Sequence, residues 1–195
     1  MASNPKQRFT PEEYLEFERK AEFKSEYLDG QIYAMAGASP EHSAITFNLS
    51  VEVGIGLRGK PCQGFSNDTK IRTSYSGLYS YPDLSVVCGE PVFHNDKRDV
   101  LINPKVIFEV LSPSTERFDR GTKFLRYQTI DSFTDYVLIA QDEPRVEHFI
   151  RQEDGSWRYV VVRGMESKLT IASIDCAVAL AGPYDKINFS EAPQE

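Results

Sequence analysis

The chain has 195 residues, 41% of them hydrophobic and 26% charged, which is typical of one folded domain and excludes a disordered or fibrous chain. Its formal net charge of −7 argues against a dedicated non-specific nucleic-acid binder, because such proteins are usually basic. The three cysteines are far apart and contain no Cys-x-x-Cys pair, which argues against a disulfide framework or a structural zinc site and favours a reducing compartment.

The first twenty residues contain no apolar segment of the kind found in secretory signals. The run "YVLIA" at 136–140 is far too short to span a bilayer. We therefore expect a cytoplasmic protein, organised as a single domain over residues 1–195 with a flexible tail at 186–195.

Two helices and a hairpin are predicted in the first third of the chain. Thr10 is the expected N-cap of a short helix, with Pro11 at its first position and Glu13 completing a capping box. Asp29 and Gly30 separate two β-rich stretches, which is typical of a tight hairpin. A second helix is expected to begin after Ser39 and to stop near Gly59 and Pro61, with a core stripe of Ile45, Leu49 and Val53.

The rest of the chain predicts a sheet. Strands are expected near 67–73, 82–88 and 105–111, and a helix is expected to begin at Asp119 with Phe124 and Tyr127 facing inward. "DYVLIA" predicts another buried strand, and "RVEHFIR" with "WRYVVVR" predicts a terminal hairpin. These elements indicate an α/β domain around one mixed sheet. The sequence has neither GxGxxG nor GxxxxGK[ST], so it does not predict a nucleotide-binding fold.

Two acids lie on the most apolar predicted strands. Asp83 follows Pro82 at the start of one strand, and Glu109 lies within "VIFEVL". If the strands are neighbours, the two carboxylates meet at one edge of the sheet. At a separation of about 4 Å they would repel by roughly 4 kcal/mol, so a cation between them is favoured. Oxygen ligands favour Mg²⁺ or Mn²⁺ over zinc. A purely structural interpretation is equally good: Asp83 would cap a turn, and Glu109 would form a buried ion pair.

Lys123 adds a positive charge near these acids. It stands four residues after Asp119 and four before Tyr127, on one face of the predicted helix. A lysine behind two metal-binding acids can orient a water or stabilise charge on a phosphate. The alternative is an exposed ion pair with Asp119, worth only about 0.3–0.5 kcal/mol.

The chain resembles the Uma-two family of bacterial proteins in four motifs that occur in the same order: P-D, E-V-L-S-P-S-T, D-x-x-x-K-x-x-x-Y and "DYVLIA". The similarity extends upstream through "SEYLDGQIYAMAGASPEHSAI". It covers roughly residues 10–150. The resemblance implies a restriction-endonuclease-like fold, a mixed β-sheet flanked by α-helices with an N-terminal helix and β-hairpin, and a PD-(D/E)XK nuclease site.

Asp83 would be the acid of "PD" and Glu109 the D/E, both catalytic and both metal ligands. The motif's lysine should stand two residues after the acid, where this chain has Leu111. The resemblance implies that Lys123 supplies the ammonium from the following helix.

Four more residues are candidates for contacts with a metal ion, a ligand or a phosphate. The resemblance suggests that Glu26, in "SEYLDG", reaches the site as an additional ligand, although an exposed strand carboxylate is the simpler interpretation. His42, in the first turn of the second helix, could contact a ligand or act structurally. Lys70 and Arg72 share one strand face and could contact phosphates or be solvated surface residues.

The leading hypothesis is a metal-dependent endonuclease that hydrolyses phosphodiester bonds of DNA with Mg²⁺ or Mn²⁺ and no organic cofactor. By resemblance we expect a homodimer, so that two sites address two strands. The alternative is a catalytically inactive module of the same fold that binds nucleic acid or protein, which Leu111 and the acidic net charge favour. A small-molecule hydrolase with the same metal site is a third hypothesis.

Overall fold

The structure is a computed structural model that describes residues 7–73 and 77–189. The strands within these ranges are β1 (Ser25–Leu28), β2 (Gln31–Ala34), β3 (Cys62–Ser66), β4 (Lys70–Arg72), β5 (Leu78–Ser80), β6 (Leu84–Cys88), β7 (Val100–Leu101), β8 (Val106–Val110), β9 (Asp135–Ile139), β10 (Arg145–Arg151), β11 (Trp157–Arg163), β12 (Lys168–Ile171) and β13 (Cys176–Ala179). The helices are α1 (Pro11–Glu18), α2 (Pro40–Gly56), α3 (Glu116–Phe118), the π-helical turn η1 (Asp119–Lys123), α4 (Phe124–Tyr127) and the 3₁₀ turn η2 (Ala172–Ile174).

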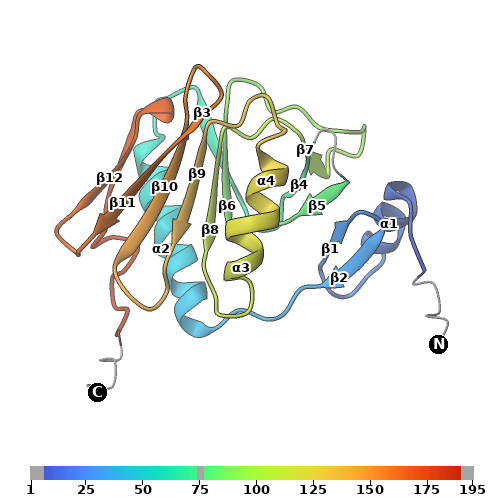
Figure 1. Ribbon diagram of the computed structural model, residues 1–195, viewed down its shortest axis with the longest axis horizontal. Helices are drawn as coiled ribbons and strands as arrows, with labels where there is room; N and C mark the ends of the chain where they lie inside the picture. The colour runs from blue at the N-terminus through green and yellow to red at the C-terminus, as the bar shows by residue number, and fades with distance from the viewer. Residues whose placement is uncertain (1–6, 74–76, 190–195) are drawn as a thin grey trace.

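The described strands divide into two sheets and a hairpin rather than the single sheet that the sequence predicts (Figure 1). One sheet has the strand order β2-β1-β5-β4-β7 and the other has the order β11-β10-β9-β8-β6-β3. The β10–β11 hairpin, which the sequence analysis expected to be terminal, is followed by a second hairpin in which β12 pairs with β13. The chain crosses between the two sheets several times, and one crossing from the first sheet to the second lies between β5 and β6. Pro82 lies in this link, and because proline has no N–H to donate, it favours a break in the ladder there.

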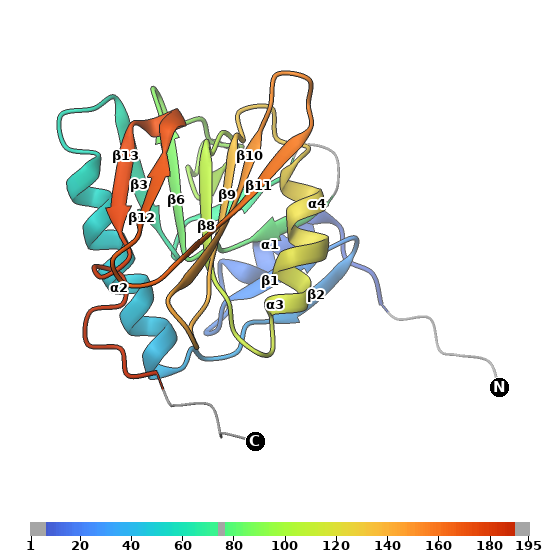
Figure 2. The same cartoon turned by 60° about the vertical axis from the view of Figure 1, so that its left-hand side comes forward.

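The two long helical segments cover opposite faces of the six-stranded sheet (Figure 2). On one face, the predicted stripe Ile45, Leu49 and Val53 of α2 is buried in a core that also includes β12 and β13. On the other face, Tyr127 of α4 packs with Ile107 and other apolar side chains of the sheet. The site described below lies on this second face.

The local signals for helices and the first hairpin are confirmed. Thr10 and Glu13 exchange the two hydrogen bonds of a capping box at α1. Ser39 caps α2 by accepting the His42 N–H at 3.1 Å. Asp29 and Gly30 form the β1–β2 turn with φ of 48° and 91°, the left-handed region that favours glycine.

Two further expectations concern the membrane and the C-terminal segment. None of the helices in the described ranges is long and apolar enough to cross a membrane. Ile187 and Phe189, within the segment predicted to be a flexible tail, pack against the α2 core, whereas residues 190–195 lie outside the described ranges.

The expectation of no disulfide is wrong. Cys62 of β3 and Cys88 of β6 stand directly opposite each other in the antiparallel ladder and are bonded, while Cys176 is free and buried. "CQGFS" carries no clear strand pattern, so the pairing of β3 beside Cys88 could not be predicted from it. The bond ties β3, at the edge of the six-stranded sheet, to the strand that leads from Asp83.

We expect reduction of this disulfide to lower the free energy of unfolding by about 3 kcal/mol, because the bond closes a loop between residues 26 apart. A Cys62→Ser/Cys88→Ser variant should show the same loss, and adding reductant should not change it further. Urea unfolding with and without reductant measures both. Equal stability of oxidised and reduced wild type would contradict this expectation.

Candidate active site

Strand alternation places Glu109 on the face of β8 that the α3–η1–α4 segment covers. Val106, Phe108 and Val110 belong to the core on the α2 side, whereas Ile107 belongs to the core on the opposite side. Because successive residues of a strand point to opposite faces, Glu109 shares the face of Ile107. It is the charged member of a strand whose five residues are all buried.

Asp83 reaches the same level of the sheet from the neighbouring strand. In the antiparallel β6–β8 ladder Leu84 stands opposite Phe108, so one further step places Asp83 opposite Glu109. The Asp83 carboxylate accepts the Val110 N–H at 2.7 Å. The two strands are therefore neighbours, which is the condition under which the sequence analysis brings the two carboxylates together.

His42 meets Asp83 from the first turn of α2. Its Nε2 lies 3.4 Å from Asp83 Oδ2. Burial alone would lower the pKa of His42, but the hydrogen bonds to Asp83 and to the Val110 backbone outweigh burial and leave the pKa above its ordinary value. His42 thus contacts Asp83, one of the two residues that the resemblance assigns to a metal site, and the backbone of Val110 beside the other.

Lys123 lies at the centre of the site. Its Nζ is 3.2 Å from Glu109 Oε1, 3.2 Å from Glu26 Oε1 and 3.1 Å from Asp119 Oδ1. The three acids come from β8, β1 and the helical segment itself, so one ammonium joins both sheets and the helix that covers them. The pair with Asp119 is buried rather than solvent-exposed, contrary to the simpler interpretation of its four-residue spacing.

The helix that carries Lys123 contains a π-helical turn over Asp119–Lys123 and begins at Glu116, three residues before the predicted start. The wider i→i+5 turn brings residues four and five apart closer to one line along the helix, and such turns often mark functional sites. A π turn also leaves backbone carbonyls without their usual helical partners. The Tyr136 hydroxyl of β9 donates to the Asp119 carbonyl at 3.1 Å and so fixes the turn on the sheet.

Tyr127 and Ser80 belong to the site although the sequence analysis did not place them there. The Tyr127 hydroxyl donates to Glu109 Oε1 at 3.1 Å and lies 2.8 Å from Ser80 Oγ. The spacing of Tyr127 from Lys123 was the available signal. Ser80 had none, because its position depends on the pairing of β5 with β1.

The buried charges shift one another's pKa. Burial raises the pKa of the Glu109 carboxyl well above its ordinary value; the Lys123 ammonium opposes this rise, and the carboxylates of Asp119, Asp83 and Glu26 add to it. Burial would lower the pKa of Lys123, but its carboxylate neighbours, first Glu109 and then Glu26, raise it well above its ordinary value. Lys123 therefore remains an ammonium at neutral pH.

Side-chain exposure shows from which side the site is reached. The side chains of Glu109, Lys123 and Asp119 are 5%, 7% and 2% exposed, whereas those of Glu26, Asp83 and His42 are 13%, 12% and 16% exposed. The first three form the closed end. A ligand would approach past the β1 hairpin, the β5–β6 link and the start of α2, which carry the other three.

The donor set fits a hard divalent cation. Asp83 and Glu109 present carboxylate oxygens at one level of two paired strands, within a cluster that also contains Glu26 and Asp119. Within the described ranges, no group of three or more His, Cys, Asp or Glu residues stands where it could hold a metal ion. Mg²⁺ needs fewer protein ligands than that, because it commonly binds through one or two carboxylates and keeps several waters.

The structure places the remaining predicted residues outside this cluster. Leu111, at the motif's lysine position, packs in the apolar core near Tyr127. Lys70 is buried, with its Nζ 5.4 Å and 5.3 Å from the ring centroids of Tyr14 and Tyr81, so it does not present a charge to a phosphate. Arg72 lies within 2.7 Å of the His94 ring.

Comparisons with known proteins agree with the resemblance seen in the sequence. Residues 11–180 match the model of the Uma2 family, described as "Putative restriction endonuclease". Two Synechocystis proteins are similar to the chain: uncharacterized protein slr1290 is 35% identical over 192 residues, or 96% of this chain and 97% of that protein. Uncharacterized protein sll1609 is 36% identical over 160 residues, or 82% and 90% of the two chains.

A crystal structure from Anabaena variabilis, described as a "putative nuclease belonging to DUF820", superposes with a TM-score of 0.75 over 92% of this chain and 99% of that one. At 18% identity this similarity concerns the fold. The predicted α/β, restriction-endonuclease-like fold is confirmed.

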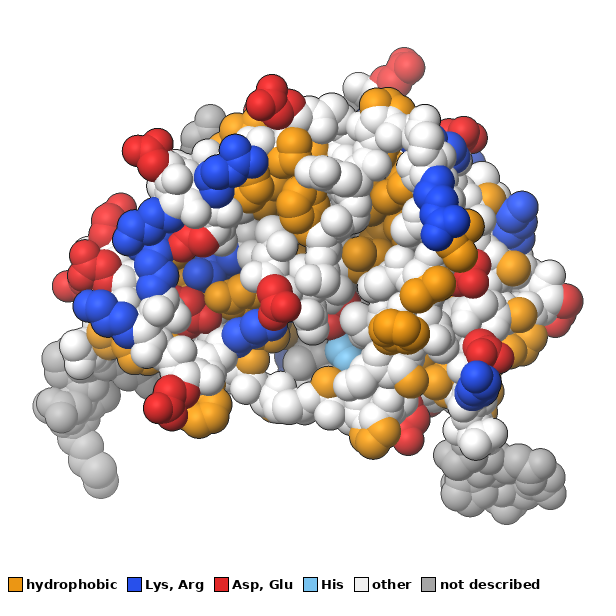
Figure 3. Space-filling model, turned by 180° about the vertical axis from the view of Figure 1, so that it is seen from behind, with side chains coloured by type: hydrophobic (Ala, Val, Ile, Leu, Met, Phe, Trp, Pro, Cys, Tyr) orange, Lys and Arg blue, Asp and Glu red, His pale blue; other side chains and the backbone are white. Residues whose placement is uncertain are grey.

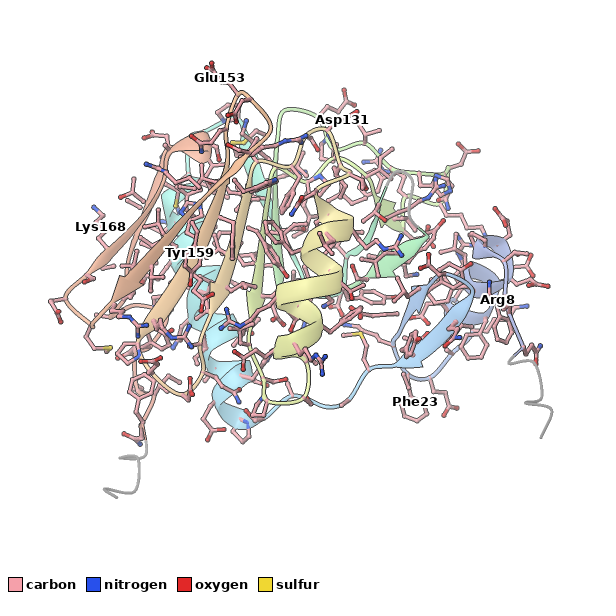
Figure 4. The ribbon with its side chains drawn as sticks, in the orientation of Figure 1. Arg8, Phe23, Asp131, Glu153, Tyr159 and Lys168 are labelled. Atoms are coloured by element: carbon pink, nitrogen blue, oxygen red, sulfur yellow. A yellow bond between two sulfur atoms is a disulfide. The ribbon has the colours of Figure 1, made fainter. Side chains whose placement is uncertain are left out.

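We expect Lys123→Met to lower the free energy of unfolding by about 3 kcal/mol or more, because it leaves three buried carboxylates without their shared cation. Lys168→Met is the matched control, since Lys168 projects from β12 into solvent (Figure 4) and should change stability by less than about 0.5 kcal/mol. Urea unfolding measures both. A Lys123→Met protein as stable as the control would show that the ammonium does not hold the cluster together.

We expect Glu109→Gln to be more stable than wild type at pH 8, by about 1 kcal/mol or more. The folded pKa of Glu109 is raised, so the stability that its carboxyl contributes is fully present below the unfolded value of about 4.3 and is lost as the pH rises through the folded value. The neutral glutamine avoids that loss. The difference from wild type should therefore shrink as the pH falls towards 4.

Chemical unfolding at both pH values tests this, with Glu153→Gln in the exposed β10–β11 turn as the control (Figure 4). A Glu109→Gln protein that is less stable than wild type at pH 8 would contradict the expectation.

Proposed function

The chain belongs to the Uma2 family, and on that premise we propose that it is a metal-dependent endonuclease that hydrolyses phosphodiester bonds of DNA. The family description and the nuclease-like fold support the broader assignment to nucleases. The metal, the substrate and the roles of individual residues are our proposal.

One observation carries it: Lys123 Nζ stands 3.2 Å from Glu109 Oε1 although the usual motif position holds Leu111. The sequence left open whether an ammonium from the next helix reaches the acid of the strand. This distance supports a site in which Asp83, Glu109 and Lys123 take the three PD-(D/E)XK roles.

In the proposed mechanism Asp83 and Glu109 would hold one or two Mg²⁺ or Mn²⁺ ions, and the Val110 backbone carbonyl would be a further ligand. When bound, the ion would supply Lewis acidity towards a phosphate oxygen and towards the attacking water. The Val110 N–H and His42 orient the Asp83 carboxylate, and Tyr127 orients that of Glu109. Glu26 is the additional ligand nearest the open side of the site.

Lys123 has two proposed tasks. Its ammonium stabilises the negative charge that develops on the phosphate, and it balances the carboxylates while no ion is bound. Since its pKa is raised, it acts as a hydrogen-bond donor and a charge rather than as a general base. The proton of the attacking water must therefore leave towards a carboxylate or the solvent.

We also propose a cytoplasmic location, no organic cofactor and, as the resemblance implies, a homodimer. The net charge of −7 makes non-specific attraction to a polyanion weak, so binding would depend on the ion and on local contacts near the open side of the site.

To test the proposal, supercoiled plasmid is incubated with Mg²⁺ or Mn²⁺ and wild-type protein, or with Asp83→Asn, Glu109→Gln or Lys123→Met. We expect wild type to nick the plasmid and each variant to lose about 100-fold or more of the rate, because each lacks a ligand or the charge that stabilises the transition state. Glu153→Gln and Lys168→Met, which change exposed residues far from the site, should cleave as wild type does (Figure 4). Chelation with EDTA should stop cleavage.

Equal residual cleavage by all proteins would identify a contaminant and remove the claim. If no protein cleaves plasmid, single-stranded DNA or RNA, calorimetric titration with Mn²⁺ decides between the remaining functions. Binding by wild type that is lost in Asp83→Asn would favour a hydrolase of another substrate. Absence of binding at millimolar Mn²⁺ would favour a non-catalytic module.

A further inference from the structure

The proposed mechanism gives no role to Asp119, although this acid lies within the charged cluster. Asp119 is 1% exposed, and its Oδ1 accepts no hydrogen bond from the described part of the chain. Lys123 Nζ lies 3.1 Å from this oxygen, but the hydrogen bond that the ammonium donates goes to Glu109 Oε1 at 3.2 Å. A buried carboxylate oxygen without a hydrogen bond is rare and calls for an explanation.

The backbone holds Asp119 in a fixed position. Asp119 begins the π-helical turn and Lys123 ends it. The Tyr136 hydroxyl donates to the Asp119 carbonyl at 3.1 Å, and Tyr136 is itself fully buried in β9. An aspartate has a short side chain, whereas a lysine carries its ammonium on a flexible four-carbon stem. If the pair rearranges, the ammonium therefore moves and the carboxylate stays in place.

Two cations compete for the same carboxylates. Lys123 Nζ lies 3.2 Å from both Glu109 and Glu26, which the proposed mechanism assigns to a divalent ion. An ammonium and a divalent ion on the same oxygens repel each other. Entry is from the open side, where the side chains of Glu26 and Asp83 are 13% and 12% exposed, so the ammonium is displaced towards the closed end. Asp119, whose side chain is 2% exposed, lies at that end.

We propose that Asp119 is a positioning residue for Lys123: when Glu109 and Glu26 bind a divalent cation, the Lys123 ammonium leaves them and donates to Asp119 Oδ1. The change needs only rotations within the lysine side chain, because Oδ1 already lies 3.1 Å from Nζ. It also explains why a buried oxygen has no hydrogen bond while the ammonium donates to Glu109. The inference rests on the proposed function for the divalent cation.

This exchange gives Lys123 its two proposed tasks in turn. The ammonium first balances Glu109 and Glu26 and then, held by Asp119, stays beside the site to stabilise charge on the phosphate. Its charge matters because acidic and basic side chains are interspersed on the reverse face of the molecule rather than gathered into a basic surface (Figure 3). Since the net charge is −7 as well, attraction of a phosphate depends strongly on charges within the site.

Calorimetric titration with Mn²⁺ tests the exchange in a cycle of Asp119→Asn, Lys123→Met and the double variant, after circular dichroism has shown that each protein is folded. We expect the factor by which Asp119→Asn weakens Mn²⁺ binding to be about tenfold larger with Lys123 present than in the Lys123→Met background, because the ammonium couples Asp119 to the ion. Glu116→Gln is the matched control. It removes a carboxylate of the same helical segment that pairs with Arg120 rather than with Lys123, and it should change binding by less than about twofold.

The outcomes separate this inference from the proposed function. Equal factors in the two backgrounds would show that Asp119 acts only as a fixed negative charge, and they would overturn the inference alone. Failure of the wild-type protein to bind Mn²⁺ at millimolar concentrations would overturn it together with the proposed metal site.

Crystal structures of the wild-type protein with and without Mn²⁺ give a second test, which does not depend on the folding of any variant. With Mn²⁺ bound, we expect Lys123 Nζ to donate to Asp119 Oδ1 and to lie more than about 4 Å from the carboxylates of Glu109 and Glu26. Without Mn²⁺, Lys123 should donate to Glu109. An ammonium that still contacts Glu109 beside the bound ion, or an Asp119 that binds the ion itself, overturns the proposal.

Discussion

The buried ammonium of Lys123 is the interaction on which the rest of the site depends. Lys123 contacts carboxylates from β1, β8 and its own helix, and these three elements belong to different layers of the molecule. A lysine left alone in such a place would be neutral or would not fold there, because burial of an unpaired charge costs several kcal/mol. Three carboxylates around one ammonium more than compensate its charge, so the cluster has an excess of negative charge. Such an excess of negative charge favours the binding of a further cation.

Such a cluster is a poor way to stabilise a domain. A core of the same volume made of apolar side chains would often be at least as stable, since paired buried charges rarely recover the full cost of leaving water. The surroundings of the cluster reduce this cost without removing the charges: Tyr127 donates to Glu109, the Val110 N–H donates to Asp83, and Tyr136 donates to the π turn that carries Asp119. Retention of charge under so much structural support is the pattern expected where the charges perform chemistry.

Local signals in the sequence were sufficient for much of this structure. Caps located α1 and α2, alternation placed Glu109 on a buried strand, and the spacing of Asp119, Lys123 and Tyr127 put all three on one helical face. Features that depend on contacts between residues far apart in the sequence were not predicted. The Cys62–Cys88 bond depends on the pairing of β3 with β6, and the residues "CQGFS" do not have a pattern that predicts a strand. The position of Ser80 depends on the pairing of β5 with β1, and the division into two sheets depends on pairings between strands that are far apart in the sequence. No short window of sequence contains that information.

The position of the lysine is also a matter of packing. Leu111, which directly follows β8, belongs to the same apolar core as Tyr127, Ile130 and Phe133, and the helix rather than the strand supplies the ammonium. From the helix, Lys123 reaches Glu109 and gains Glu26 and Asp119 as well. The proposed mechanism requires an ammonium near the acid and near the phosphate, and either the strand or the helix can supply it. A motif defined by spacing along one strand can therefore be lost from the sequence while the arrangement of charges that it encodes persists in space.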